Sequence, residues 1–256
     1  MSKKRLDLIL FEHGFFETKN AASAAILAGN VKINDALITK AGEQFDDTKL
    51  FDEKNPAKIE IDIMPYVSRG GLKLEHALKE FNINLKDKIC IDMGASTGGF
   101  VDCMLQAGAK FVYALDCGYN QLSWKLKNDN RIKSIEKINV KNCTFDEVYN
   151  ENDELPSFMS MDLSFISIKK VLENCKNLIS NDATCVLLIK PQFEAQRNEI
   201  AHGGVVKDEK IRIKIIEDIK TFCDSIGFDT LGVTKSPIKG AKSKNIEYLI
   251  YLKRRN

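Results

Sequence analysis

The sequence contains no apolar run that approaches the ~18 residues needed by a membrane-spanning helix. Its longest apolar stretches, such as residues 185–189, have the length of a strand. The basic residues 1–5 are followed by charges at Asp7 and Glu12, which interrupt what would be the apolar part of a signal peptide. These absences argue against membrane insertion and secretion, so we expect a cytoplasmic protein with no membrane partner.

Cysteine clusters are also absent. The seven cysteines include no Cys-x-x-Cys pair, and neighbouring cysteines are at least 10 positions apart. An odd, unclustered set argues against a zinc site and against a disulfide framework. We therefore expect no metal, and cysteines that are buried apolar thiols in a reducing compartment.

The chain has little excess charge, since 38 Lys+Arg and 36 Asp+Glu leave a formal net charge of +2. This balance excludes a uniformly basic coat for nucleic acid, but it allows local basic patches. The strongest basic bias lies in residues 235–256, with seven Lys+Arg against Glu247. We expect Lys242 and Lys244 in this tail to contact phosphates, and a solvated sheet edge is the alternative.

The remaining composition is typical of a globular protein, with 44% apolar and 29% charged residues. A length of 256 residues suits one large domain or two smaller ones. Pro65 biases Met64 towards an extended conformation and interrupts regular structure. We therefore predict a domain over residues 1–62, a linker over 63–66 and a second domain over 67–256.

The first domain is predicted to be a small α+β unit of two helices followed by short strands, with helix ends marked by capping residues and glycines. The expected elements are a helix over 3–13 capped by Ser2 and ended by Gly14, a helix over 21–28 capped by Thr18 or Asn20 and ended by Gly29, a strand over 31–33, a turn at Asn34 and Asp35, and strands at Ile38 and 59–61.

Four segments of this unit resemble an S4 RNA-binding domain, namely residues 5–7, 21–26, 29–34 and 38–40. The resemblance implies that the two helices present basic and polar residues to folded RNA. Residues 1–62 hold 9 Lys+Arg and 11 Asp+Glu, so an RNA-binding face must be segregated from an acidic one. An ordinary solvated helical hairpin is the alternative. The matching RNA-binding residues are Lys3, Lys4, Arg5, Lys19, Asn20, Ser23 and Lys32.

Strands and helices alternate from Lys88 onward, which predicts an α/β fold with a parallel sheet covered by helices on both faces. A helix over 72–81 precedes this part. The expected strands are 89–93, 111–116, 158–162, 184–189, 230–234 and 246–252, and the expected helices are 99–107, 168–178 and 208–226.

The turn at residues 92–100 indicates a nucleoside cofactor, because it is rich in glycine, follows a strand and opens a helix. Asp92 within this turn would repel a pyrophosphate but attract an ammonium group. Asp116 ends the next strand, where a carboxylate can hold both ribose hydroxyls. These features favour S-adenosylmethionine over NAD, and a tight turn without a ligand is the alternative. The expected cofactor-binding residues are Asp92, Gly94, Ala95, Ser96, Thr97, Gly98, Gly99, Phe100, Asp116 and Cys117.

Two lysines and two carboxylates at strand or helix ends are suited to deprotonating and orienting a hydroxyl. They are Lys73, Asp162, Lys190 and Glu247. The Asn/Asp-Pro-Pro-aromatic run of base-amino methyltransferases is missing after the strand at 158–162, and no proline precedes a cysteine as in pyrimidine carbon-5 methyltransferases. Each residue also has a purely structural interpretation. Lys73 could be a solvated helix lysine and Asp162 a helix cap. Lys190 could close a strand, and Glu247 could pair with Lys242 or Lys244.

These four positions resemble the Lys-Asp-Lys-Glu tetrad of FtsJ-like ribose 2′-O-methyltransferases. Together with the S4-like unit, the whole chain resembles the TlyA, or hemolysin A, family of ribosomal RNA methyltransferases. The matching segments are 68–74, 92–100, 116–122, 161–167 and 190–194.

The resemblance implies a class I, Rossmann-like methyltransferase sheet that uses S-adenosylmethionine to methylate a cytidine ribose in rRNA. Since the chain has almost nothing beyond the two domains, the shorter members of the family are the better match, which implies large-subunit (23S) rRNA. Lys190 would take the proton of the 2′-hydroxyl, and Arg69 would contact the RNA. Two alternatives stay open: a non-catalytic rRNA-binding assembly factor, and a cytolysin.

Overall fold

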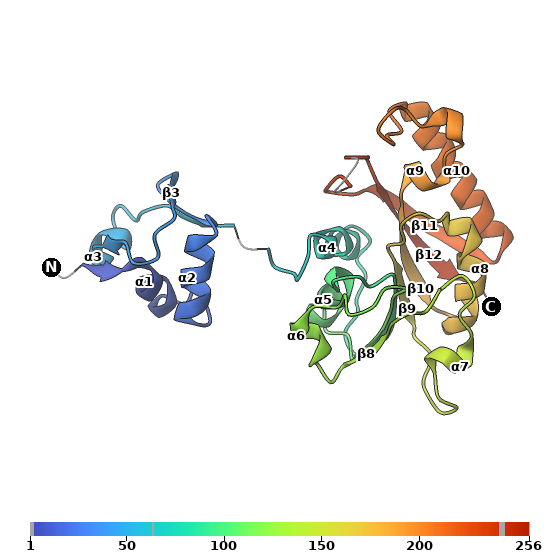
Figure 1. Ribbon diagram of the computed structural model, residues 1–256, viewed down its shortest axis with the longest axis horizontal. Coiled ribbons are helices and arrows are strands. Elements are labelled where there is room, and N and C mark those ends of the chain that lie inside the picture. The colour runs from blue at the N-terminus through green and yellow to red at the C-terminus, as the bar shows by residue number, and fades with distance from the viewer. Residues whose placement is uncertain (1–2, 63, 241–243, 256) are drawn as a thin grey trace. The chain divides into compact units, whose positions relative to one another are not determined.

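The computed structural model describes residues 3–62, 64–240 and 244–255, and the chain divides into two compact units, Met1–Met64 and Pro65–Asn256 (Figure 1). Each unit has its own hydrophobic core. Ser2 and Lys242, to which roles were assigned from the sequence, lie outside the described residues. Among the helices that the structure describes, none is long and apolar enough to cross a membrane.

The first unit packs short helices against a small antiparallel sheet of strand order β3-β2-β5, and a two-stranded pair β1-β4 lies beside them. Leu6, Ile9 and Leu10 from the first helix and Ala22 and Ile26 from the second are fully buried in its core. The elements are β1 (Lys4–Arg5), α1 (Leu6–Glu12), α2 (Lys19–Leu27), β2 (Val31–Ile33), β3 (Ala36–Ile38), β4 (Gln44–Phe45), α3 (Asp47–Leu50) and β5 (Ile59–Ile61).

Capping residues and glycines mark where several of these elements begin and end. The Thr18 side chain accepts a hydrogen bond from the Ala21 amide and begins α2, as expected of an N-cap. Gly29 has a φ of 75°, a left-handed conformation that suits glycine after a helix. The first helix was predicted to begin at Lys3, which is wrong: Lys4 and Arg5 pair with β4, so α1 begins at Leu6.

The second unit is built on a seven-stranded sheet in which β8, β7, β6, β9 and β10 are parallel, and β12 and β11 complete one edge in antiparallel pairing. The strands in sheet order are β11 (Phe228–Lys235), β12 (Tyr248–Arg254), β10 (Thr184–Ile189), β9 (Phe158–Met161), β6 (Ile89–Met93), β7 (Phe111–Leu115) and β8 (Ile132–Ile135).

Helices cover both faces of this sheet, which confirms the predicted α/β architecture (Figure 1). One core contains Leu74 and Phe100 from the helices on one face, and the other contains Leu172 and Ile219 from the opposite face. The helices are α4 (Gly70–Glu80), α5 (Gly99–Gln106) and α6 (Trp124–Lys127) on one face, α7 (Phe145–Val148), α8 (Leu172–Cys175) and α10 (Glu209–Ser225) on the other, and α9 (Pro191–Glu194) after β10.

Three expectations for this unit are corrected. The helix predicted over 168–178 is broken into a 3-10 turn, α8 and a second 3-10 turn, because Val171 (φ −125°, ψ −40°) leaves the helical conformation. Strand β8 was not predicted, since Lys133 and Ser134 make it too polar to read as a buried strand. Asp92 lies inside β6, as the predicted strand over 89–93 implies, and its buried position corrects the interpretation that it belongs to the turn.

Candidate active site

Three parallel strands bring candidate residues to one edge of the sheet. Asp92 is near the carboxyl end of β6, while Asp162 and Lys190 directly follow β9 and β10. Since β6, β9 and β10 are adjacent and parallel, the residues at their carboxyl ends converge at the place where open α/β sheets bind ligands. Lys73 comes from α4, and Glu247 directly precedes β12.

The four residues of the candidate tetrad form one connected cluster of charges. Lys73 Nζ lies 2.6 Å from Glu247 Oε2 and 3.9 Å from Asp162 Oδ2. Lys190 Nζ lies 2.6 Å from Asp162 Oδ1 and donates a hydrogen bond to Ser164 Oγ at 3.0 Å. The order Glu247–Lys73–Asp162–Lys190 therefore alternates negative and positive charges along the cluster.

The cluster is largely shielded from solvent. Lys73 is 8% exposed and Glu247 is 2% exposed, so neither is a solvated surface charge. Glu247 pairs with Lys73 rather than with Lys244, and β12 is an interior strand of the sheet rather than an edge. All four residues line the cleft, so a substrate hydroxyl that enters it can reach the cluster.

Two glycines allow the backbone to pass through this crowded region. Gly94 has a φ of 90°, and a Cβ atom there would lie 2.9 Å from the carbonyl oxygen of Asp162. Gly98 has a φ of 95°, and its Cβ would lie 2.2 Å from Leu126. Only glycine fits both positions, so the glycine pattern of this turn has a steric cause.

Asp92 is the acidic residue at the bottom of the glycine turn. Its Oδ1 accepts a hydrogen bond from Ser160 Oγ at 2.7 Å, while Oδ2 is buried without a partner among the described residues. Burial raises the pKa of Asp92 to about 7. A buried acceptor that lines the cleft without a partner is a place where a cationic ligand group gains a strong hydrogen bond. The other cleft-lining residues of this turn are Gly94, Ala95, Ser96, Thr97, Gly99 and Phe100.

Asp116, after β7, ties two loops together beside the cleft. Its carboxylate accepts hydrogen bonds from the amides of Ser96 and Gly118, both at 2.7 Å. Each carboxylate oxygen can accept a further bond, so the group can also hold ligand hydroxyls. Cys117 lines a cavity together with Asp116. It is exposed, whereas the other six cysteines are buried, and this corrects the expectation of seven buried thiols.

An apolar wall that was not predicted from the sequence lines the cleft beside Lys190. Phe165 is 83% exposed with a φ of 66°, and its ring centroid lies 5.2 Å from that of Phe193. These rings, Gln192 and Ile200 line a cleft of about 620 Å³ that also contains the tetrad. The matched segments 161–167 and 190–194 include both aromatic residues, but nothing in the sequence shows that Phe165 points into solvent.

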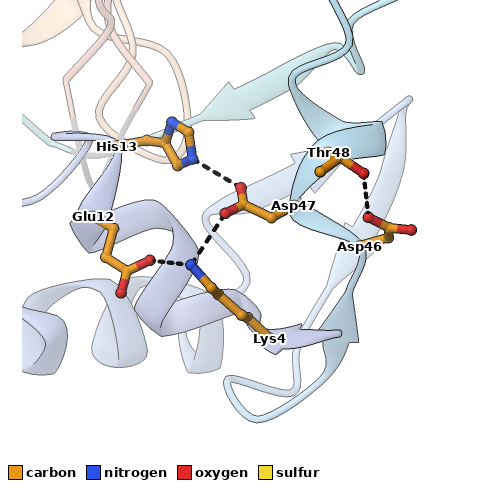
Figure 2. Close-up of polar contacts among 6 residues, drawn as sticks. All are labelled: Lys4, Glu12, His13, Asp46, Asp47 and Thr48. Atoms are coloured by element: carbon orange, nitrogen blue, oxygen red, sulfur yellow. Dashed lines mark hydrogen bonds and ion pairs between the residues drawn. The ribbon is translucent and has the colours of Figure 1, made fainter. Parts of the chain in front are cut away.

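Some of the residues proposed to bind RNA form ion pairs within the protein, and others do not. Figure 2 shows Lys4 between Glu12 and Asp47, at 2.8 and 3.3 Å, and these hydrogen bonds raise the pKa of Lys4. Arg5 is paired with buried Asp7 at 2.7 Å. These two charges are therefore largely neutralised within the unit. The remaining candidates of the first unit lie at its surface, with Lys3, Lys19, Asn20 and Lys32 exposed and Ser23 half-buried.

In the second unit, the candidate RNA contacts Arg69 and Lys244 are both exposed, and Arg69 lines the cleft. Part of the basic tail has structural partners instead. Arg254 donates to the carbonyl oxygens of Lys176 and Ile179, and Arg255 forms ion pairs with acidic residues near the end of α10 and in β11. The side chains of Arg254 and Arg255 are therefore engaged in contacts within the second unit.

Comparisons with known proteins match this arrangement over nearly the whole chain. The FtsJ-like methyltransferase model matches residues 66–254, and the S4 domain model matches residues 4–47. The chain belongs to the FtsJ-like methyltransferase family. Its S4 domain and its relatives place it among the TlyA, or hemolysin A, proteins, as the sequence motifs predicted.

Three relatives illustrate this kinship. Hemolysin A of Brachyspira hyodysenteriae is 44% identical and the match covers 96% of this chain and 98% of the relative. The 16S/23S rRNA (cytidine-2′-O)-methyltransferase TlyA of Mycobacterium tuberculosis is 34% identical, with 98% and 90% covered. A solved structure from Streptococcus thermophilus, provisionally named a hemolysin, is 40% identical, covers 100% of this chain and 90% of that one, and has a TM-score of 0.73.

Within the part of the chain that the structure describes, no three His, Cys, Asp or Glu side chains are arranged to hold a metal ion.

Proposed function

We propose that this protein transfers a methyl group from S-adenosylmethionine to the 2′-oxygen of a cytidine in ribosomal RNA, most simply in the large subunit. The observation that carries the proposal is the cluster of Lys73, Asp162, Lys190 and Glu247 in one cleft beside the glycine turn. The substrate is supported by relatives named as rRNA (cytidine-2′-O)-methyltransferases, one of them, from Campylobacter jejuni, as a 23S enzyme.

The residues around the glycine turn fit the proposed cofactor. The unpartnered Oδ2 of Asp92 suits the ammonium group of its amino-acid part, and the Asp116 carboxylate suits its ribose hydroxyls. When bound, S-adenosylmethionine supplies an electrophilic methyl group on a positively charged sulfur. The Asp92 carboxylate at the glycine turn is complementary to positive charge and would repel a dinucleotide pyrophosphate.

Lys190 is the residue proposed to accept the proton of the 2′-hydroxyl, because it ends the charge cluster beside the Phe193 ring, whereas Lys73 is bonded to Glu247. In the neutral amine form, Lys190 would take the hydroxyl proton as the 2′-oxygen bonds to the methyl carbon and the bond from that carbon to sulfur breaks, which would leave a neutral thioether. Asp162, at 2.6 Å, then stabilises the ammonium that results. Lys73, which is itself bonded to Glu247, lies 3.9 Å from the other oxygen of Asp162 and helps to hold that carboxylate beside the base.

The wall formed by Phe165 and Phe193 supports an RNA substrate. Exposed aromatic rings beside a basic residue are the usual means by which proteins hold an unstacked base, with ~1–3 kcal/mol per stacked base. A ribose 2′-oxygen can approach Lys190 only if its nucleotide enters the cleft. We therefore propose that the target nucleotide is taken from a single-stranded or locally opened part of the rRNA.

The direct test maps 2′-O-methyl groups on rRNA from cells with and without the gene for this chain, and repeats the mapping after adding back the wild-type protein or its Lys190→Ala variant. A cytidine mark that depends on the wild-type protein and is absent with the variant supports the proposal. Marks unchanged by deletion, with protein that still binds ribosomal particles, would favour a non-catalytic assembly factor.

A release assay separates the remaining alternative. Leakage of dye from purified, cofactor-free liposomes on addition of the protein would support a cytolysin. We expect no leakage, because none of the helices that the structure describes is long and apolar enough to cross a membrane.

A further inference from the structure

Gln192 has an amide group that the tetrad chemistry does not use. It lies in α9, two residues after Lys190, and lines the same cleft as Phe165 and Phe193. Its Oε1 atom is buried and has no hydrogen-bond partner among the described residues. A buried acceptor left without a partner costs free energy, and in native proteins such groups call for an explanation.

We propose that Gln192 recognises the base of the target nucleotide through its hydrogen-bonding edge, an inference that rests on the proposed function. The two aromatic rings offer faces for stacking, whereas the amide offers hydrogen bonds beside them. This is the arrangement needed to hold a base on its face and read it along its edge. Entry of a base with a suitably placed donor would give Oε1 the partner that it lacks among the described residues.

The amide is complementary to cytosine. Oε1 accepts a hydrogen bond from the exocyclic N4 amine, and the amide NH2 group donates to the ring nitrogen N3. Uracil presents the opposite pattern of donors and acceptors. With the amide in the same orientation, Oε1 would face the O4 acceptor of uracil and the amide NH2 group would face its N3–H donor, so neither hydrogen bond could form. A bidentate amide–base pair of this type provides about 5- to 150-fold discrimination against the wrong base. Gln192 is therefore inferred to be a specificity-determining residue.

The test uses ribosomal subunits that carry either the mapped target cytidine or a uridine at that position, both isolated from cells lacking the methyltransferase. Single-turnover methylation is measured with wild-type protein and with Gln192→Met, which keeps the length of the side chain but removes the amide. Gln196→Met is the matched control, because Gln196 is four residues away, exposed, and outside the cleft. Thermal unfolding and cofactor affinity report on the fold of each variant.

We expect wild-type protein and Gln196→Met to methylate cytidine about 5- to 150-fold faster than uridine. Gln192→Met should methylate cytidine more slowly than wild-type protein by a similar factor, while its rate on uridine should stay within about twofold of the wild-type rate. A purely structural role would slow both substrates alike, and that outcome overturns the inference, as does an unchanged rate on both. Wild-type protein that methylates neither particle would instead overturn the proposed function itself.

Discussion

Lys73 Nζ lies 2.6 Å from Glu247 Oε2, although 174 residues separate them in the chain. The pair joins α4 to the start of β12 and is almost completely shielded from solvent. Since a buried charge is tolerated only when it is paired, each residue depends on the other. The contact therefore belongs to the stability of the second unit as well as to its chemistry.

The first prediction concerns this pair. Lys73→Met should leave Glu247 as an uncompensated buried charge and lower the free energy of unfolding by about 3–5 kcal/mol. The double variant Lys73→Met/Glu247→Leu should recover most of that loss while remaining inactive. Denaturant unfolding of the three proteins measures both effects. A loss of less than about 0.5 kcal/mol for the single variant, as expected of a surface substitution, would contradict the buried pair.

The second prediction concerns the proposed base. Lys190→Ala should keep cofactor and particle binding but lose turnover by about 10²–10⁴-fold, the usual effect of removing a general base. Lys170→Ala is a suitable control, since Lys170 is exposed and does not line the cleft. Single-turnover rates at saturating cofactor give the comparison. Equal rates for the two variants would remove Lys190 from the mechanism.

The third prediction concerns cofactor binding by Asp116. Asp116→Ala removes the proposed ribose contacts and also the carboxylate that accepts from the Ser96 and Gly118 amides, so affinity for S-adenosylmethionine should fall at least about tenfold. The exposed residue Asp146 provides the control variant Asp146→Ala. Calorimetric titration that finds wild-type affinity for Asp116→Ala would show that the group holds no ligand.

The fourth prediction is a pH dependence of stability that comes from Asp92. Burial raises its folded-state pKa to about 7, with Asp162 and Asp116 adding to the rise and Ser160 opposing it. The native state therefore binds more protons than the unfolded state between pH ~4 and ~7, and stability falls as pH rises through that window. The loss amounts to about 4 kcal/mol at most, at ~1.4 kcal/mol per pH unit.

The measurement compares cofactor-free wild-type protein with Asp92→Asn by denaturant unfolding from pH 4.5 to pH 8. The difference between the two should change steadily up to pH ~7 and then level off, because the carboxamide introduced by the substitution does not titrate. Parallel curves across the whole range would mean that Asp92 is ionised in the folded protein throughout.

The fifth prediction separates docking from chemistry. The second unit contains the glycine turn, Asp116 and the whole tetrad, together with its own core, so a chain of residues 65–256 should bind S-adenosylmethionine as tightly as the full protein. It should fail to methylate ribosomal particles, because one open cleft offers too few contacts to select a single ribose. Near-normal methylation at the wild-type nucleotide would assign the S4 unit another role.

The strands at the centre of the second unit could be read from the sequence. The predicted bounds of β6 and β10 agree with the structure, because parallel strands buried on both faces are continuous apolar runs. Helices that end at a glycine, such as α2 before Gly29, could also be located, because the glycine is a local signal for the end of a helix. Elements without such local signals were missed, as with β8, whose polar residues are tolerated at the sheet edge.

The sequence by itself determined which chemical groups the site would contain, since the glycine turn and the motifs around Lys190 are contiguous in the chain. Only the tertiary structure decided how those groups are used. It pairs Glu247 with Lys73, withdraws the charges of Lys4 and Arg5 into ion pairs, and leaves one oxygen of Asp92 without a partner among the described residues. Such pairings depend on distances between segments far apart in the chain, and local sequence pattern carries no information about them.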